Sequence, residues 1–118
     1  MTTRIILVDD HAIVRRGLAG ILSEHPDFKV VGEAADYSEL RHVLRSGGAD
    51  VVVLDIGLPG KSGIEILQHL VDEYPKVRVL MLSIYPEDQY GLRALRSGAA
   101  GYLNKASAPD ELVRAVEV

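Results

Sequence analysis

The sequence predicts a doubly wound α/β domain, with a five-stranded parallel sheet and helices on both of its faces. Short apolar runs recur along the 118 residues, and most of them lack the alternation of apolar and polar residues that one exposed face would give. Segments with helical periodicity lie between these runs, so strands and helices are expected to alternate. The predicted strands are 5–8, 30–31, 51–54, 77–82 and 99–103.

The predicted helices follow from apolar residues repeated at helical spacing. Proline stands near the start of two of them, at Pro86 and Pro109, where its missing amide costs no hydrogen bond. The residues that carry the repeats are Val14, Leu18, Ile21 and Leu22; Ile64, Leu67, Leu70 and Val71; Tyr90 and Ala94; and Leu112, Val113 and Val116.

Two helix ends are marked by the same four residues, Leu-Arg-Ser-Gly, at 44–47 and 95–98. A basic residue in the last turn followed by glycine is typical of a helix C-terminus. The flanking residues do not match and no period emerges, so these are similar caps and not an internal repeat. About five βα units result.

Composition favours one globular domain, because 47% of the residues are hydrophobic and 25% are charged. Lys and Arg number 13 against 17 Asp and Glu, and no basic cluster follows the chain, so we expect no nucleic-acid binding by this segment alone. The absence of cysteine excludes disulfides, thiolate metal sites and a cysteine nucleophile.

The first residues, Met1 to Arg4, precede only a short apolar run and then two aspartates, which excludes a signal peptide. No apolar run approaches the roughly 20 residues of a membrane-spanning helix. We therefore expect a cytoplasmic protein that neither spans nor enters a bilayer.

Polar residues directly follow four of the predicted strands. The carboxyl ends of parallel strands meet at one edge of the sheet, where ligands bind, so we expect these residues to converge. Three carboxylates placed together would repel one another unless a cation intervened. The residues are Asp9 and Asp10, Asp55, Ser83, and Asn104 with Lys105.

A hard divalent cation, Mg²⁺ or Mn²⁺, fits the three carboxylates, because such ions prefer oxygen ligands and commonly bridge carboxylates to phosphate. Asp10 and Asp55 are the expected direct ligands, Asp9 is expected to act through a bound water, and the backbone carbonyl of Gly57 is a further candidate. The alternative is that these aspartates only begin loops or cap helices.

Asp55 is the best candidate for a nucleophile toward phosphorus, which would give an acyl phosphate. The cation and Lys105 would neutralise charge on the phosphoryl oxygens, and the Ser83 hydroxyl would donate to one of them. The alternatives are that Lys105 is a solvated surface cation and that Ser83 caps a strand end.

Two other patterns are weaker. Gly60, Lys61 and Ser62 are like the end of a phosphate-binding P-loop, but the first glycine of that motif falls on Asp55, and Pro59 lacks an amide. The four histidines are expected at the surface, with no pair at a chelating spacing. His11 alone lies near the acidic pair.

Several motifs, taken in order, resemble the receiver domains of bacterial response regulators over essentially the whole chain. They occupy 6–11, 54–60 with Gly63, 82–83 and 101–105. Within that family the chain is most similar to the NarL/FixJ (LuxR-type) branch, through 9–11 with 15–18, through 30–34, and through Ala106 after Lys105. The resemblance implies a flavodoxin-like receiver fold.

The resemblance also implies roles for individual residues. Family members take a phosphoryl group from a sensor histidine kinase, often form homodimers, and in this branch usually control a C-terminal helix-turn-helix DNA-binding domain. We expect residues 1–118 to be the receiver domain of such a longer protein. The implied roles are phosphoacceptor for Asp55, metal binding for Asp9 and Asp10, switch hydroxyl for Ser83, switch aromatic for Tyr102 and phosphate contact for Lys105.

In the implied switch, Ser83 moves toward the phosphoryl group and Tyr102 rotates into the space left behind, which reshapes the helix expected from about Pro86 to Ser97. The alternative for Tyr102 is a static core aromatic. Lys61 replaces an apolar residue common in the family, Gly57 offers no side chain to position water, and Ile84 is bulky. We expect slow self-dephosphorylation and slow access for small phosphodonors.

Two other functions remain open. A hydrolase with an aspartyl-phosphate intermediate typically has Asp-x-Asp at its nucleophile, whereas the second position here is Gly57. An interaction module with the same fold but no phosphorylation is disfavoured by the acidic pair, Asp55 and Lys105, all of which are present.

Overall fold

The computed structural model describes residues 2–58, 62–83, 94–105 and 108–117. Strands and helices alternate along these residues, as the sequence predicts. The helix expected from about Pro86 lies mostly outside them, although residues 94–96 are described and are helical. The elements are β1 (Thr3–Val8), α1 (Ala12–Ser23), β2 (Phe28–Ala34), α2 (Tyr37–Gly47), β3 (Val51–Asp55), α3 (Gly63–Glu73), β4 (Arg78–Ser83), β5 (Gly101–Asn104) and α5 (Ala108–Glu117).

The five strands form one parallel sheet in the order β2-β1-β3-β4-β5. The chain runs outward from β1 to β2, returns to β3 on the other side of β1, and continues to β4 and β5. The strand order therefore reverses between β1 and β3, where Val8 is in register with Leu54. Ligands of doubly wound sheets bind beyond the strand ends at such a reversal.

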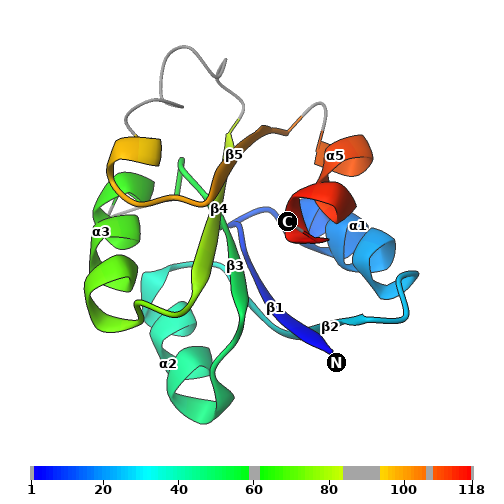
Figure 1. Cartoon of the computed structure of the whole chain (residues 1–118), viewed down its shortest axis with the longest axis horizontal. Helices are drawn as coiled ribbons and strands as arrows, with labels where there is room; N and C mark the ends of the chain where they lie inside the picture. The colour runs from blue at the N-terminus through cyan, green and yellow to red at the C-terminus, as the bar shows by residue number, and fades with distance from the viewer. Residues whose placement is uncertain (1, 59–61, 84–93, 106–107, 118) are drawn as a thin grey trace.

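Helices cover both faces of the sheet, with α2 and α3 on one side and α1 and α5 on the other (Figure 1). The side chains of β1 alternate between two buried clusters. Ile6 and Val8 pack with the α2 and α3 side chains, whereas Ile5 and Leu7 pack with those of α1 and α5. Because both faces are buried there, the strand has an apolar residue at each position from Ile5 to Val8, which is why the sequence shows no alternation.

The edge strand β2 differs most from its sequence prediction. Only 30–31 form an apolar run, yet the strand extends from Phe28 to Ala34, with partly exposed residues in its middle. An edge strand pairs with one neighbour and needs apolar residues at fewer positions. Length predicted from apolar runs alone is therefore too short there.

The predicted glycine caps are partly confirmed. Gly98 has a φ of 106°, in the left-handed region that favours glycine. At the end of α2, however, Gly47 is still helical and the next residue, Gly48, has the positive φ of 70°. The helix thus continues one residue further than the prediction.

The start of α3 packs tightly against the loop that follows β3. The Gly63 amide donates to the Ile56 carbonyl at 3.2 Å, and a Cβ at Gly63 would lie 2.5 Å from the Ile56 Cα. Only glycine permits this approach. The contact fixes the backbone immediately after Asp55.

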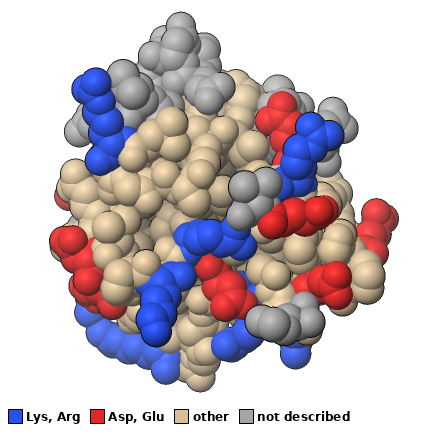
Figure 2. All heavy atoms as spheres, in the orientation of Figure 1, with Lys and Arg blue, Asp and Glu red and all other residues tan. Residues whose placement is uncertain are grey.

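Basic and acidic side chains are interspersed over the face shown in Figure 2. No charge of a single sign gathers on the described part of that face, which therefore presents no broad field of one sign. Among the helices that the structure describes, none has the length and apolar character needed to cross a membrane.

Candidate functional site

Three strand ends bring two carboxylates and one ammonium group together. Asp9 directly follows β1, Asp55 is the last residue of β3, and Lys105 directly follows β5. The Lys105 Nζ lies 2.9 Å from Asp9 Oδ2 and 3.1 Å from Asp55 Oδ2. The convergence predicted for these side chains is thus present, and one lysine bridges both acids.

Both bridged carboxyl groups are buried, with Asp9 only 1% exposed and Asp55 3% exposed. Burial, together with the charge of Asp9, raises the pKa of Asp55 more than the Gly57 amide and Lys105 lower it. Burial also disfavours the charge of Asp9, but Lys105 and the His11 amide outweigh it and lower the pKa of Asp9.

The ammonium group is stabilised by the same contacts. Burial alone would lower the pKa of Lys105, but its contacts with Asp9 and Asp55 outweigh that effect and raise the pKa above its usual value. Lys105 is therefore a cation at neutral pH, anchored in place because its amide donates to the Ser83 carbonyl at 2.7 Å. It does not behave as a solvated surface lysine.

Asp10 and His11 complete the cluster. One ligand atom from each of Asp9, Asp10, His11 and Asp55 lies within 4.8 Å of the others. Asp10 is the more accessible acid, with 33% of its side chain exposed. The three carboxylates of the predicted cation site are therefore close enough to share one ion.

The site fits a divalent cation on two grounds. Three carboxylates face one ammonium group, which leaves a net negative charge for an ion to neutralise. In addition, Asp9 Oδ2 is buried and accepts no well-aligned hydrogen bond within the described residues; the nearby Lys105 ammonium contacts it as an ion pair. Oxygen donors of this kind suit Mg²⁺ or Mn²⁺.

Gly57 contacts the site through its amide, which donates to Asp55 Oδ1 at 3.0 Å. Its carbonyl as a cation ligand stays a prediction. Ser83, the last residue of β4, is fully buried, and its backbone carbonyl holds Lys105. The hydroxyl role of Ser83 likewise stays a prediction.

Tyr102 lies in β5, three residues before Lys105, and is 9% exposed. It belongs to the core cluster on the α2 and α3 side of the sheet, together with Ala94 and Ala99. The ring is thus packed, as a core aromatic would be. Its proposed rotation is a prediction about a second state.

Two residues beside the acids have contacts that sequence reasoning missed. The His11 Nδ1 lies 3.0 Å from Asp9 Oδ1 and 3.1 Å from Asp10 Oδ1, although the residue is exposed as predicted. One helical turn later, Arg15 donates to the Asp9 carbonyl and, at 3.1 Å, to Glu33. The position of His11 directly after the acidic pair was the available signal.

The P-loop alternative gains no support from Ser62. Its hydroxyl accepts from the Glu65 amide at 3.3 Å, which makes it the N-cap of α3. Pro59, Gly60 and Lys61 lie outside the described residues.

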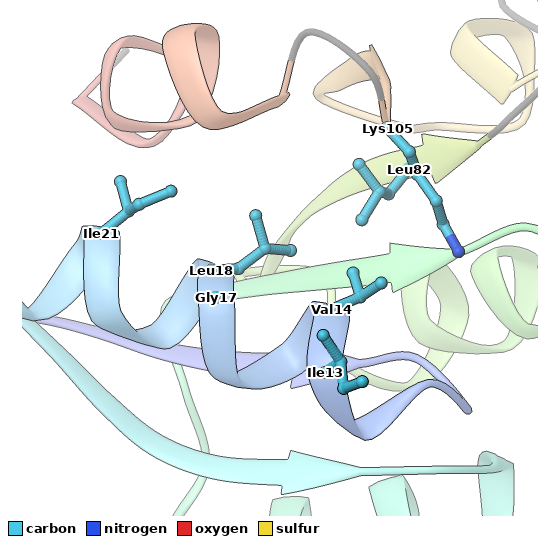
Figure 3. Close-up of a pocket in the computed structure, with 7 residues that line it drawn as sticks. All are labelled: Ile13, Val14, Gly17, Leu18, Ile21, Leu82 and Lys105. Atoms are coloured by element: carbon cyan, nitrogen blue, oxygen red, sulfur yellow. The ribbon is translucent and has the colours of Figure 1, made fainter.

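An apolar groove of about 210 Å³ runs along α1 to the site (Figure 3). Lys105 stands at one end of it, and Ile13 projects from α1 with 84% of its surface exposed. The groove is lined by Ile13, Val14, Gly17, Leu18, Ile21, Leu82 and Lys105.

Comparison with known proteins gives one family. The model of the response regulator receiver domain matches residues 5–117. The chain is 41% identical over 114 residues to the DNA-binding transcriptional activator DevR/DosR of Mycobacterium tuberculosis, covering 97% of this chain and 52% of that protein. It is 36% identical over 115 residues to the transcriptional regulatory protein DegU of Brevibacillus brevis, covering 98% and 49%.

Solved structures indicate the same family. A two-component response regulator of the LuxR family from Aurantimonas sp. SI85-9A1 superposes with a TM-score of 0.91 at 41% identity, covering 99% of this chain and 84% of that one. The chain spans about half the length of the curated relatives it matches.

Proposed function

This chain belongs to the family of response regulator receiver domains, and on that premise we propose that Asp55 is its phosphoacceptor. Phosphorylation of an aspartate is general to the family, and the solved relatives of the chain include a LuxR-family regulator and the signal receiver domain of NarL from Mycobacterium tuberculosis. The observation that carries the proposal is the Lys105 ammonium held between Asp9 and Asp55. A buried aspartate beside a fixed cation can attack phosphorus.

The steps follow from the side chains. A carboxylate oxygen of Asp55 attacks the phosphorus atom of the donor in line with the leaving group, giving an acyl phosphate. Lys105, now paired with Asp55, moves its contact to a phosphoryl oxygen as the charge of the carboxylate is lost. The Ser83 hydroxyl donates to another of these oxygens.

Asp10 and Asp55 would hold Mg²⁺ or Mn²⁺ directly, Asp9 through water, and the Gly57 carbonyl would add a fourth oxygen. When bound, the ion supplies charge neutralisation for the phosphoryl oxygens. The burial of Asp9 and Asp55 supports this assignment, because the carboxylates meet little competition from solvent.

The switch would couple Asp55 to the edge of the sheet. Ser83 and Tyr102 lie on the neighbouring strands β4 and β5, where Met81 is in register with Tyr102 and Ser83 with Asn104. A shift of Ser83 toward the phosphoryl group would open space for the Tyr102 ring and so change the surface near residues 94–96.

The partners belong to a longer protein. Residues 1–118 would be its receiver domain, a sensor histidine kinase its phosphodonor, and a C-terminal helix-turn-helix domain its route to DNA. A homodimer formed on phosphorylation and a cytoplasmic location complete the proposal. The apolar groove with exposed Ile13 supports a protein donor, because it adjoins Lys105.

Receiver domains of transcriptional regulators are signalling domains and not enzymes in the usual sense. This one would assist its own phosphorylation and dephosphorylation, each once per cycle. The second reaction is expected to be slow, because Gly57 has no side chain to orient a water against the acyl phosphate.

The test is incubation with Mg²⁺ and a small phosphodonor, acetyl phosphate or phosphoramidate, followed by analysis of the protein. A receiver accumulates a stoichiometric adduct on Asp55 that is stable in acid and labile in base. A hydrolase turns the donor over catalytically, and an interaction module shows no adduct. Either of these last two results would refute the proposal.

A further inference from the structure

His11 contacts both members of the acidic pair at once. Its amide donates to Asp9 Oδ1 at 2.8 Å, and its Nδ1 lies 3.0 Å from that same oxygen and 3.1 Å from Asp10 Oδ1. His11 is the N-cap residue of α1, yet its side chain makes no hydrogen bond to the amides of the helix. The imidazole is directed at the carboxylates instead.

A hydrogen bond from the imidazole to these carboxylates requires a hydrogen on the ring nitrogen that faces them. A carboxylate only accepts hydrogen bonds, so a nitrogen facing two of them must be an N–H donor. Asp9 Oδ1 is therefore contacted by both the amide and the ring of His11, and Asp10 Oδ1 lies within ion-pair distance of the same ring nitrogen. The second oxygen of Asp9, Oδ2, is buried and accepts no well-aligned hydrogen bond among the described residues.

We propose that His11 is a positioning residue of the cation site, which fixes Oδ1 of Asp9 and of Asp10 so that their second oxygens face the ion. This inference rests on the proposed function, because it concerns the same carboxylates. Asp10 is partly exposed and would otherwise sample several rotamers, so holding it removes an entropic cost of binding. Groups that orient metal ligands typically change affinity 10 to 100-fold, which is roughly the effect expected here.

One other role for His11 has the same starting geometry. One of its ring nitrogens belongs to the group of atoms within 4.8 Å, so His11 could itself ligate an ion. The two roles differ in their metal preference. Mg²⁺ takes oxygen ligands, whereas Co²⁺ readily takes imidazole, so a direct ligand would matter far more for Co²⁺.

The experiment measures Mg²⁺ and Co²⁺ affinities by calorimetric titration in the parent chain, His11→Phe and His42→Phe. His42 is exposed on α2 and serves as the matched control. We expect His11→Phe to lower the affinity for both ions by about tenfold and His42→Phe to leave both affinities unchanged. Equal Mg²⁺ affinity in all three, or a loss confined to Co²⁺, would overturn the positioning role.

A double-mutant cycle separates positioning from a general structural effect. If His11 acts through Asp10, adding His11→Phe to Asp10→Ala should weaken Mg²⁺ binding by much less than tenfold. Additive losses would contradict the inference. Should the parent chain fail to bind Mg²⁺ at all, the proposed function itself fails, whereas parent-like binding by His11→Phe removes only the role of His11.

Discussion

Asp55 is a buried carboxyl group whose charged form the folded structure disfavours. It is buried beside Asp9, and burial with that neighbouring charge raises its pKa. A carboxyl group whose pKa is raised on folding binds its proton more tightly in the folded chain than in the unfolded one. Its ionised form therefore opposes folding at neutral pH, so keeping this carboxylate charged in the folded chain costs some stability.

Asp55→Asn should therefore raise the unfolding free energy at pH 7 in the absence of divalent ions, because the substitution removes the buried charge. The gain should shrink as the pH falls through the raised pKa of Asp55 toward the usual aspartate range, because the parent then loses the charge. Urea unfolding at several pH values measures it. Asp72→Asn, on the exposed surface of α3, is the control, and a less stable Asp55→Asn at pH 7 would contradict the assignment.

Gly57 leaves room beside Asp55, the proposed phosphoacceptor. A Cβ added there would lie 3.7 Å from Asp55 Oδ1, an ordinary contact, and the backbone needs no glycine. Gly57→Asn should therefore fold normally and bring an amide near the acyl phosphate. We expect loss of the phosphoryl group to accelerate roughly tenfold, because an oriented water attacks more readily.

First-order decay of the adduct, after removal of the phosphodonor, measures this rate. Gly57→Ala fills the same space without a hydrogen-bonding group and should decay like the parent. Identical decay in all three chains would show that the missing side chain does not limit the reaction.

At the scale of elements, α1 does more than cover the sheet. It carries His11 at its start and Ile13 on its exposed surface, beside the groove that ends at Lys105. A large apolar side chain that is 84% exposed contributes little to folding. Its position beside the groove is consistent with the proposed contact with a protein phosphodonor.

Ile13→Ser should slow phosphoryl transfer from a histidine kinase by about tenfold, the cost of one lost apolar contact at an interface. Transfer from acetyl phosphate should be unchanged, because a small donor needs no such contact. Leu95→Ser, at the other large apolar side chain exposed among the described residues, is the control. If transfer from both donors slowed equally, Ile13 would act on the phosphoryl-transfer step itself and not on binding of the kinase.

The start of α3 is constrained by backbone packing. Gly63→Ala should destabilise the fold by about 1 to 3 kcal/mol, since its Cβ would lie 2.5 Å from the Ile56 Cα and neither backbone segment can yield easily. Gly20→Ala in α1 meets no atom within 4 Å and should be neutral or stabilising by up to about 1 kcal/mol. Thermal unfolding of both variants checks this opposite response, and equal stability would contradict it.

At the scale of the whole molecule, much of the site could be predicted because parallel strands share a direction. Asp9, Asp55 and Lys105 each end or follow an apolar run, and a parallel sheet brings such ends together. His11 could not be assigned in this way. Its contacts depend on how the chain turns between β1 and α1, which apolar periodicity does not encode.

The fold, like the site, was predictable from the sequence in some elements and not in others. Buried strands such as β3 were found almost to the residue, since both faces demand apolar side chains. The bounds of the edge strand β2 were not predicted, because an edge strand tolerates polar residues. The end of α2 was not predicted either, because the sequence does not show which of the adjacent glycines Gly47 and Gly48 adopts the positive φ. Where burial alone decides the residue type, sequence was sufficient; where backbone geometry decides it, the structure was needed.

The strand order of the sheet brings together site residues from two separate parts of the chain. A chain severed between α2 and β3 would leave Asp9 and Asp10 in one fragment, and Asp55 and Lys105 in the other. Neither fragment would hold the ion tightly, and cation affinity would return only when the two pieces reassociate. Metal uptake in such a split chain would serve as a direct reporter of sheet reassembly.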